Sequence, residues 1–411
     1  MMSAGYEFPV YKRLDFDVVD GDGVRVRTAD GREFIDFYGG HAVASLGYGD
    51  PGLLAAMQGQ AERIHFQTNL VEMEVRRLAH ADLASVAPAG LDRVFMVNSG
   101  AEANENALRL AFRATDRTRV VALEGGFHGR TAAAGACTHG NQKWYAFPRA
   151  PFDVTWVAPD DGDALRSAID DDVAAVILEP VQGIAGARPL SQEVLQVARS
   201  ESSRRGALLI SDEVQCGMGR TGSMFAIDES GVVPDIITTA KGLAGGFPAG
   251  AVIARSDLAD ALTPGALGTT FGGGPLACAM VREVVARLRA PGFLDHVLTV
   301  GESIAARCVT GPVVAVQGRG LLVGLVCDRP AAEVLPWLRE RGVLAGGASD
   351  PSVVRLMPPL IIGESEVDVL VSALADVATS APAPNPSPPG GGSQTLPQGG
   401  DSDSVPSGAS S

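Results

Sequence analysis

The chain has 411 residues, and its 33 basic and 48 acidic side chains give a formal net charge of −15 at pH 7. This acidic balance argues against a nucleic-acid partner, which requires clustered Lys and Arg. The hydrophobic share of 46% and the charged share of 20% are typical of a globular protein with a sizeable core. The length predicts two or three folded units.

The cysteine pattern and the absence of long apolar runs restrict the class of protein further. The five cysteines include no Cys-x-x-Cys pair, so we predict neither a disulfide framework nor a metal site. No apolar stretch reaches the about 18 residues that cross a bilayer, and the N-terminus lacks a signal-peptide pattern. We expect a cytoplasmic protein without a membrane partner.

Short apolar runs alternate with helical patterns along most of the chain. Asp30-Gly31, between the strand-like segments 24–28 and 33–37, indicates a hairpin. Helical patterns follow at 102–112 and 192–204. Further strands are expected at 94–97, 120–123, 174–178, 207–211, 236–239 and 251–254. Continuous apolar strands separated by helices predict an α/β fold with a mostly parallel sheet and helices on both faces.

The same patterns suggest how the chain is divided. We expect a large α/β domain over residues 51–290. A smaller α+β lobe would combine residues 1–50 with residues 291–379, in which strands are expected at 321–327 and 353–357. Residues 380–411 are mostly Pro, Gly and Ser, and they cannot bury enough apolar surface to offset the entropy of ordering, so we expect a disordered tail.

Three strand ends carry residues that suggest chemistry. The strand at 94–97 runs through Asn98-Ser99-Gly100-Ala101 into a helix, whose N-terminal N–H groups favour an anion such as phosphate. An ordinary helix cap explains this segment equally well. Asp212 ends another apolar strand, where an ionised carboxylate is costly unless it meets a cation, and a surface acid is the alternative.

The third strand end carries Lys241, which precedes a glycine-rich loop. Desolvation lowers the pKa of a lysine and makes its amine nucleophilic, although a lysine that extends to solvent is the simpler interpretation. Together, an anion site, a strand-end carboxylate and a lysine after the next strand are what pyridoxal phosphate (PLP) requires. The Gly-x-Gly-x-x-Gly pattern at 217–222 argues little for a dinucleotide, because acids precede it and no helix of sufficient length follows.

Several longer motifs resemble the class III PLP-dependent aminotransferases, most closely the acetylornithine aminotransferase branch. The resemblance covers about residues 10–377. The motifs are Asn98-Ser99-Gly100-Ala101-Glu102-Ala103-Asn104-Glu105, Gly126-Phe127-His128-Gly129-Arg130-Thr131, Glu179-Pro180-Val181-Gln182-Gly183, Asp212-Glu213-Val214-Gln215, Lys241-Gly242, Thr269-Thr270-Phe271-Gly272-Gly273 and Arg355-Leu356-Met357-Pro358-Pro359-Leu360. The resemblance implies a fold-type I transferase.

The resemblance also implies a role for each matching residue. Lys241 would bind the cofactor aldehyde and then act as the acid and base that moves the proton. Asp212 would pair with the pyridine nitrogen, and Glu179 would lie nearby. The remaining cofactor contacts would be Gly100 and Ala101 on the phosphate, Phe127 and Val214 on the two ring faces, Gln215 on the ring oxygen, and Thr270 on the phosphate of a neighbouring subunit. A homodimer would therefore be the minimal active unit.

Substrate recognition would rest on Arg130 and Arg355, whose planar guanidinium groups suit carboxylates, with Thr269 near an acylated substrate. The family usually has a glutamate after residue 183, which pairs with the arginine matching Arg355, but here Ile184 stands instead. How the site alternates between substrates is therefore open. His41 lies at a variable pocket position, where it either contacts a substrate carboxylate or fills space.

We therefore expect an aminotransferase that moves the terminal amino group of an ω-amino acid, N-acetylornithine, to 2-oxoglutarate, giving a semialdehyde and glutamate. Ornithine, succinylornithine, 4-aminobutyrate and carrier-linked lysine are alternative donors. A PLP-dependent aminomutase or decarboxylase is a further alternative. A catalytically inactive scaffold is a different class of hypothesis, against which the presence of Lys241, Asp212 and the phosphate loop argues.

Overall fold

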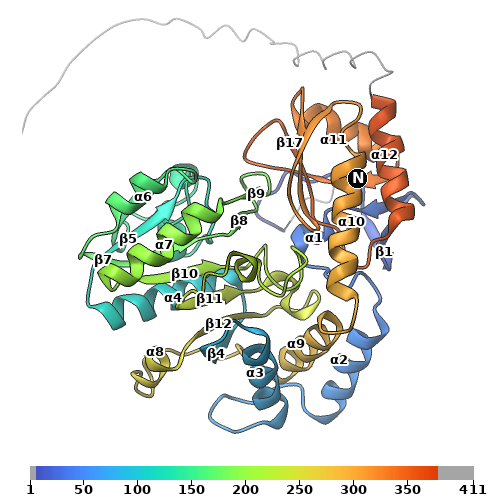
Figure 1. The fold of residues 1–411 in the computed structure, drawn as a ribbon. Coiled ribbons are helices and arrows are strands. Elements are labelled where there is room, and N and C mark those ends of the chain that lie inside the picture. Colours follow the sequence, from blue (N-terminus) through green and yellow to red (C-terminus); the bar gives the residue numbers. More distant parts are fainter. Residues whose placement is uncertain (1–5, 378–411) are drawn as a thin grey trace, which may run out of the picture.

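A seven-stranded sheet lies at the centre of the computed structural model, which describes residues 6–377 (Figure 1). Its strands, in spatial order, are β4 (Leu91–Val97), β12 (Gly250–Arg255), β11 (Ile236–Thr239), β10 (Leu208–Asp212), β7 (Val173–Leu178), β5 (Arg119–Leu123) and β6 (Asp153–Val157). The predicted α/β fold is confirmed. Strand β6 was not predicted, because it is an edge strand that mixes polar with apolar residues rather than a continuous apolar run.

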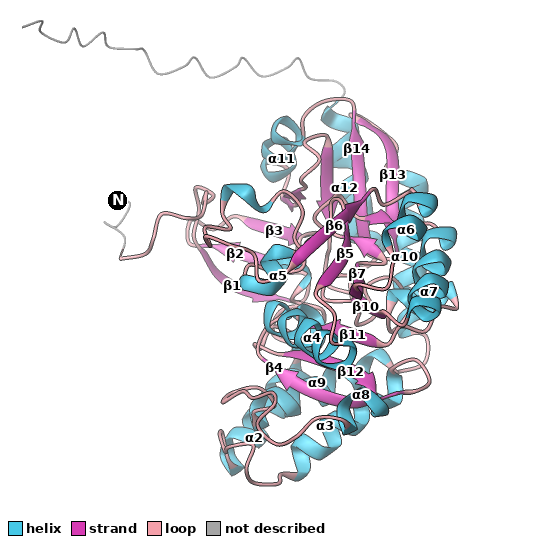
Figure 2. Cartoon of the chain, turned by 90° about the vertical axis from the view of Figure 1, so that its left-hand side faces the viewer, coloured by secondary structure: helices cyan, strands magenta, loops and turns pink. Residues whose placement is uncertain are grey.

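Helices cover both faces of this sheet, as Figure 2 shows. Because successive side chains of a strand point to opposite faces, Val120 and Ala122 of β5 pack with α4 (Gly100–Thr115) in one apolar cluster. Val121 and Leu123 belong to the other cluster, which contains the buried side of α7 (Gln192–Arg205). The strands are therefore buried on both sides, which explains why they appear in the sequence as continuous apolar runs.

One strand departs from the parallel arrangement, since β12 is antiparallel to both β11 and β4. Only ten residues, 240–249, connect β11 with β12. A parallel connection requires a crossover of about a dozen residues or more, usually through a helix. The short connection contains only the 3-10 helix η3 (Lys241–Ala244), and the chain returns antiparallel. This geometry leaves Lys241 at the carboxyl edge of the parallel strands.

Two four-stranded sheets flank the central one. The first contains β1 (Val18–Asp22), β2 (Arg25–Thr28), β3 (Glu33–Asp36) and β15 (Val343–Leu344). The second contains β13 (Val313–Arg319), β14 (Leu322–Cys327), β17 (Val353–Leu356) and β16 (Gly346–Gly347). The predicted hairpin is the antiparallel pair β2–β3. Segments from both ends of the chain lie side by side here, because β15 pairs with β3 and Arg25 contacts Glu366 of α12 (Glu364–Val377) (Figure 1).

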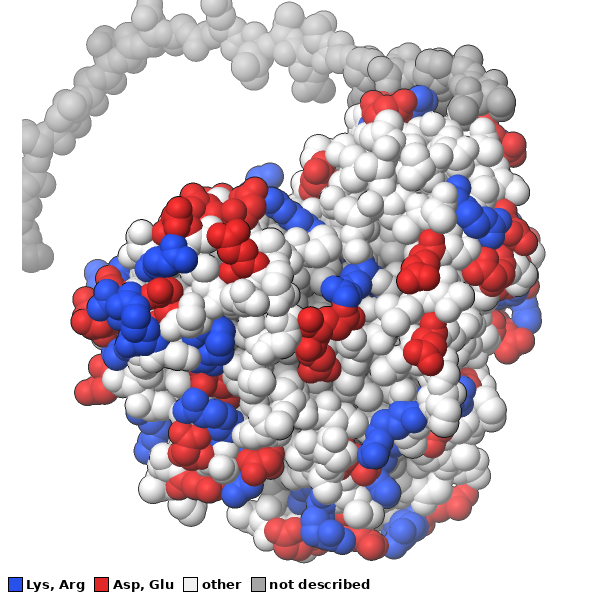
Figure 3. All heavy atoms as spheres, in the orientation of Figure 1, with Lys and Arg blue, Asp and Glu red and all other residues white. Residues whose placement is uncertain are grey.

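The remaining elements surround these sheets. They are α1 (Gly39–Ala42), α2 (Pro51–Arg63), α3 (Glu74–Val86), α5 (Ala132–Ala136), α6 (Gly162–Ala168), α8 (Ser256–Asp260), α9 (Pro275–Leu288), α10 (Phe293–Arg307), α11 (Ala331–Glu340), β8 (Val181–Gln182), β9 (Arg188–Pro189), η1 (Asn141–Lys143) and η2 (Ala226–Ser230). Between residues 6 and 377, none of the helices has the length and apolar character needed to cross a lipid bilayer. On the face in Figure 3, acidic and basic side chains are interspersed. The predicted tail at 380–411 lies outside the described residues, and the domain boundaries at 50/51 and 290/291 stay predictions.

Candidate active site

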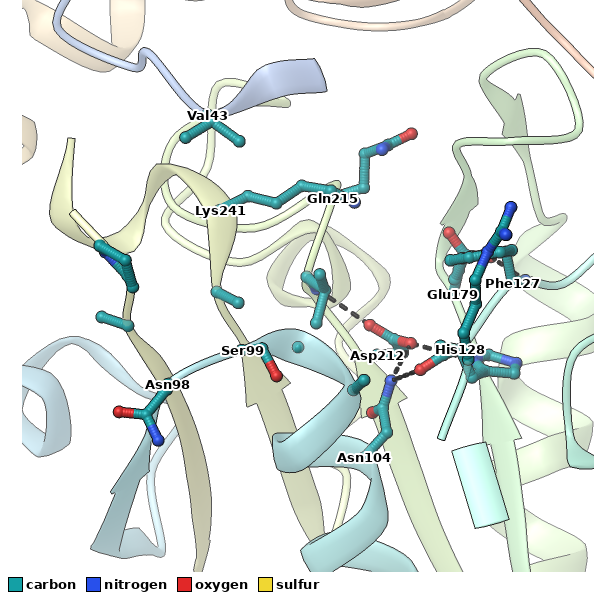
Figure 4. Close-up of a pocket in the computed structure, with 18 of the residues that line it drawn as sticks. Val43, Asn98, Ser99, Asn104, Phe127, His128, Glu179, Asp212, Gln215 and Lys241 are labelled. Atoms are coloured by element: carbon teal, nitrogen blue, oxygen red, sulfur yellow. Dashed lines mark hydrogen bonds and ion pairs between the residues drawn. The ribbon is translucent and has the colours of Figure 1, made fainter. Parts of the chain in front are cut away.

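The carboxyl ends of the parallel strands border a cavity of about 420 Å³. Such edges are where open α/β sheets place their ligand sites. Nine of the predicted site residues line this cavity, namely Gly100, Ala101, Phe127, Arg130, Glu179, Asp212, Val214, Gln215 and Lys241. Figure 4 shows how several of them approach from different strands and loops. The predicted convergence follows from the parallel strand directions.

Asp212 lies at the floor of the cavity with an exposed fraction of only 1%. Its Oδ2 accepts hydrogen bonds from Asn104 Nδ2 at 2.7 Å and from His128 Nδ1 at 2.8 Å (Figure 4). The Val214 N–H donates to Oδ1 at 3.0 Å, and Thr238 Oγ1 fixes Asn104 by donating to its Oδ1 at 2.6 Å. These donors stabilise the ionised carboxylate and fix its orientation.

Asn104 and His128 were not predicted as functional residues, although both belong to motifs that resemble the aminotransferase family. Asn104 follows Gly100 by one turn of α4, and His128 follows Phe127 in the loop after β5. A helix that begins at the cavity keeps the i+4 residue on the same side as its first residue. That spacing is the signal that could have identified Asn104.

The N-terminus of α4 provides an anion site. Ser99 is the N-cap, and its Oγ accepts the N–H of Glu102 at 3.2 Å, while its carbonyl oxygen accepts the N–H of Ala103 at 3.0 Å. The first N–H groups of a helix have no acceptor within the helix. Those of Gly100 and Ala101 therefore remain for a ligand, and the helix dipole adds to the attraction for an anion.

Lys241 follows β11 and extends into the cavity from the start of η3 (Figure 4). Its backbone φ is 49°, in the left-handed region that non-glycine residues rarely adopt. Backbone strain of this kind concentrates at functional sites. Burial lowers the pKa of the Lys241 amine, although the nearby Glu179 and Asp212 oppose that change. A larger fraction of the amine is therefore unprotonated and nucleophilic than in a solvent-exposed lysine.

Glu179 follows β7 and organises the two loops next to it. Its carboxylate accepts the N–H of Phe127 at 2.9 Å and the N–H of Gly183 at 3.1 Å. Burial raises the pKa of Glu179, and the charge of Asp212 adds to the increase. Glu179 thereby fixes the main chain at Phe127 and, through it, the position of the Phe127 ring.

Arg130 lines the cavity on the side of the loop after β5. Its guanidinium carbon lies 5.0 Å from the centroid of the Trp144 ring. Across the described part of the chain, Arg130 makes no hydrogen bond and no ion pair. A cation held over an aromatic face keeps its N–H groups available, so Arg130 is arranged to receive a carboxylate from the cavity.

Four predicted residues lie outside the lining of this cavity. Thr269 lines a separate cavity, although its Oγ1 is 3.5 Å from Nδ2 of Asn98, which lines the first. Thr270 is exposed on the same loop. Arg355 is buried in β17, and His41 lies on the turn after β3. The structure brings these last two together through Tyr38, which was not predicted as a site residue.

An anion site, a buried carboxylate and a lysine in one cavity are the groups that a PLP-binding enzyme requires. Comparisons with known proteins identify the family. The Aminotransferase class-III pattern matches residues 9–378. Acetylornithine aminotransferase of Mycobacterium tuberculosis is 42% identical over 375 residues, which cover 89% of this chain and 93% of the relative. The chain belongs to the class III aminotransferase family, whose members use an amino acid and a keto acid as substrates.

Solved structures agree with this assignment. The ornithine aminotransferase of Toxoplasma gondii matches with a TM-score of 0.85 and 31% identity, covering 91% of this chain and 92% of that one. The N-acetylornithine aminotransferase of Stenotrophomonas maltophilia matches with a TM-score of 0.77 and 32% identity, covering 90% and 97%. A second structure of the Toxoplasma enzyme has PLP at partial occupancy in its active site.

PLP is the cofactor of this family, and the cavity fits it. The α4 N-terminus suits the phosphate, the buried Asp212 suits a protonated ring nitrogen, and Lys241 would supply an amine for the aldehyde. The wall of the cavity also requires a glycine at position 100, because a Cβ on Gly100 would lie only 2.6 Å from Val214 Cγ1. When bound, PLP supplies an aldehyde that reacts with amines and a ring that accepts electrons.

Proposed function

We propose that the protein transfers the terminal amino group of N-acetylornithine to 2-oxoglutarate, giving the semialdehyde and glutamate. The observation that carries this proposal is that the residues lining the cavity suit the reaction for which the chain's relatives are named. A lysine whose pKa is lowered and a buried carboxylate that accepts three hydrogen bonds line the same cavity. Acetylornithine aminotransferases about 40% identical match about 90% of the chain.

Lys241 is proposed as the catalytic residue. Its amine would bind the cofactor aldehyde. Once free, the same amine would move a proton between the amine-bearing carbon of the substrate and the aldehyde-derived carbon of the cofactor. The lowered pKa favours the first role, because the unprotonated amine is the nucleophile. Asp212 keeps the ring nitrogen protonated, and the hydrogen bonds from Asn104 and His128 hold its charge in place.

The other lining residues bind and orient. Gly100 and Ala101 bind the phosphate through their N–H groups, Val214 and Phe127 enclose the ring, and Glu179 fixes the Phe127 loop. Gln215 donates to the ring oxygen. Arg130 receives a substrate carboxylate, which is consistent with its available N–H groups. Thr269, which lies outside this lining, contacts the acyl group.

Ornithine is the second candidate donor, because the Toxoplasma ornithine aminotransferase matches the fold at a TM-score of 0.85. Succinylornithine, 4-aminobutyrate and carrier-linked lysine are further donors to compare. The experiment mixes the purified yellow enzyme with each donor and follows loss of the visible cofactor band. The proposal requires rapid bleaching by N-acetylornithine and slower bleaching by ornithine. Faster reaction with ornithine reverses the donor assignment, and a colourless protein that takes up no PLP refutes the enzyme assignment.

We also propose that the active unit is a homodimer. Leu70 and Phe271 have exposed fractions of 93% and 66%, and Phe271 packs against Phe66 with ring centroids 5.4 Å apart. An exposed apolar cluster of this kind is typical of an interface between subunits. Thr270 lies on the same loop and would reach the phosphate in the partner's site.

Light scattering with size-exclusion chromatography tests the dimer. Phe271→Asp should produce a monomer that has lost activity, because each site would lose its second subunit. Val369→Asp changes an exposed apolar residue on α12 and is the matched control, which should remain dimeric. A wild-type monomer with full activity would refute the dimer proposal.

A further inference from the structure

Arg355 is a buried cation whose partners are all uncharged. Its side chain has an exposed fraction of 3%. Nε donates to the Gly347 carbonyl at 2.8 Å, and Nη1 donates to the Gly183 carbonyl at 3.1 Å and to Gln215 Oε1 at 3.0 Å. Nη2 donates to Tyr38 Oη at 3.3 Å. Among residues 6–377, no Asp or Glu forms an ion pair with this guanidinium.

This arrangement leaves Arg355 without an ion-pair partner among the described residues, although the Glu179 carboxylate, whose own pKa is raised, acts on it through space. Burial lowers the pKa of Arg355, but a guanidinium stays protonated near neutral pH. Taking such a cation out of water is costly unless an opposite charge meets it. Ile184, which lines the active-site cavity beside Gly183, cannot supply one. A ligand carboxylate would therefore supply the direct partner that these residues do not.

The donors of Arg355 show where that ligand would bind. A guanidinium has five N–H groups. Three are used by Gly347, Gly183 and Gln215, and a fourth by the Tyr38 hydroxyl, so one Nη2 hydrogen remains beside Tyr38. Gln215 belongs to the lining of the cavity, so this corner adjoins the site already described.

Tyr38 has a second partner that holds its hydroxyl. His41 Nδ1 lies 2.9 Å from Tyr38 Oη, and the two ring centroids are 4.5 Å apart. The backbone reaches this contact through a left-handed turn in which Gly40, His41 and Ala42 have φ values of 57°, 66° and 67°. Two of these residues have a Cβ, and such strain persists only where the surrounding structure enforces it.

The proton arrangement of this pair favours donation by Tyr38. Burial lowers the pKa of His41, and the positive charges of Arg355 and Lys241 add to that, so the imidazole stays neutral. In the tautomer with its hydrogen on Nδ1, His41 donates to Tyr38 Oη. Burial raises the pKa of Tyr38, so the phenol keeps its hydrogen. Because Oη accepts from both Arg355 and His41, its own hydrogen is available for an arriving carboxylate.

We propose that the Tyr38 hydroxyl and the remaining Nη2–H of Arg355 form a two-donor site for one carboxylate of a 2-keto or 2-amino dicarboxylic acid, with His41 holding Tyr38 in position. The inference rests on the proposed aminotransferase function and assigns Tyr38 as the residue that determines specificity for the acceptor. The acceptor displaces no protein carboxylate when it binds. A donor with one carboxylate, bound through Arg130, would leave the charge of Arg355 without a carboxylate partner.

Glutarate is the probe, because it has two carboxylates and neither a keto nor an amino group that reacts. Its binding to the PLP-loaded enzyme is measured by calorimetry. Tyr38→Phe keeps the ring and removes only the hydroxyl, and it should weaken glutarate binding about tenfold, as expected for one hydrogen bond to a charged group. Tyr48→Phe is the matched control, because its hydroxyl contacts Asp36 at 2.5 Å and not Arg355, and it should bind glutarate as the wild type does.

The two half-reactions separate this inference from the proposed function. In Tyr38→Phe, the KM for 2-oxoglutarate should rise about tenfold with kcat changed less than twofold, and bleaching by N-acetylornithine should be unchanged. Ile184→Glu should also weaken glutarate, because an acid beside Gly183 competes for Arg355. Unchanged glutarate affinity in Tyr38→Phe overturns the inference and leaves the proposed function intact. A wild type that N-acetylornithine does not bleach refutes the proposed function, whatever the glutarate result.

Discussion

Replacing Gly100 with Ala separates the shape of the cofactor site from its hydrogen bonds. Gly100 is the first residue of α4, and alanine there keeps both the helical backbone and the N–H group. The added Cβ would lie 2.6 Å from Val214 Cγ1 and 2.8 Å from Val214 Cγ2. Carbon atoms in favourable contact are separated by about 3.5–4.0 Å, so Val214 must move by about 1 Å.

The direction of that movement determines the effect. Val214 lines the cavity and is only partly buried, so its side chain can shift into the space that the PLP ring would occupy. Overpacking of this size costs about 1–3 kcal/mol. Because the free cavity accommodates the shift, the cost should appear when the cofactor binds, as an affinity about 5- to 150-fold weaker.

The assay titrates apoprotein with PLP and follows the visible band, and urea unfolding of the same apoprotein measures stability. Gly59→Ala is the control, because Gly59 is an exposed position of α2 with no heavy atom within 4 Å of an added Cβ. It should stabilise the chain by about 0.5–1 kcal/mol and leave PLP affinity unchanged. If Gly100→Ala binds PLP as tightly as the wild type, Val214 does not border the ring.

Three further predictions concern the pKa of Lys241, the network around Asp212, and Arg130. Burial lowers the pKa of Lys241 below its ordinary 10.5, so the Lys241→Met apoprotein should be more stable than the wild-type apoprotein at pH 7. Urea titrations should show that this difference in stability shrinks as the pH rises toward 10.5. A difference that does not change with pH contradicts the lowered pKa. Asn104→Asp replaces a donor 2.7 Å from Asp212 Oδ2 with a second acid. Urea unfolding at pH 7 should therefore show a free energy of unfolding lower by roughly 3–5 kcal/mol, and the loss should be smaller at pH 5. Stability equal to that of the wild type would refute the hydrogen-bond network. Trp144→Leu removes the ring beneath Arg130, so the KM for N-acetylornithine should rise about two- to fivefold, and Trp144→Phe should recover most of it; equal KM values in the two variants exclude the cation–π contact as the cause.

The buried strands and the residues at their ends were predictable because they depend on local patterns. The strand expected at 236–239 coincides with β11 (Ile236–Thr239). Asp212 and Lys241 then share an edge because β10 and β11 are parallel, so their carboxyl ends coincide. Strand β12 was predicted in position but not in direction, which depends on the short connection after Lys241.

The partners of these residues were not predictable, because they depend on contacts between distant parts of the chain. Asn104 is 108 residues from Asp212, and Tyr38 is 317 residues from Arg355. The left-handed turn at His41 could not be predicted from the local sequence either. The neighbouring glycines permit such a turn, but the turn occurs together with the packing of Tyr38 against Arg355, which is distant in sequence. The sequence identified Ile184 as a departure from the family, whereas only the structure shows the neutral oxygens that surround Arg355.

The central claim is that Lys241 binds the cofactor, and the composition of the chain makes one measurement decisive. Lysine occurs only at positions 12, 143 and 241. Borohydride reduction of the PLP-loaded enzyme, followed by proteolysis and mass spectrometry, should place the cofactor on the peptide that contains Lys241 and on no other. A cofactor found on Lys12 or Lys143, or on no lysine at all, would contradict the claim.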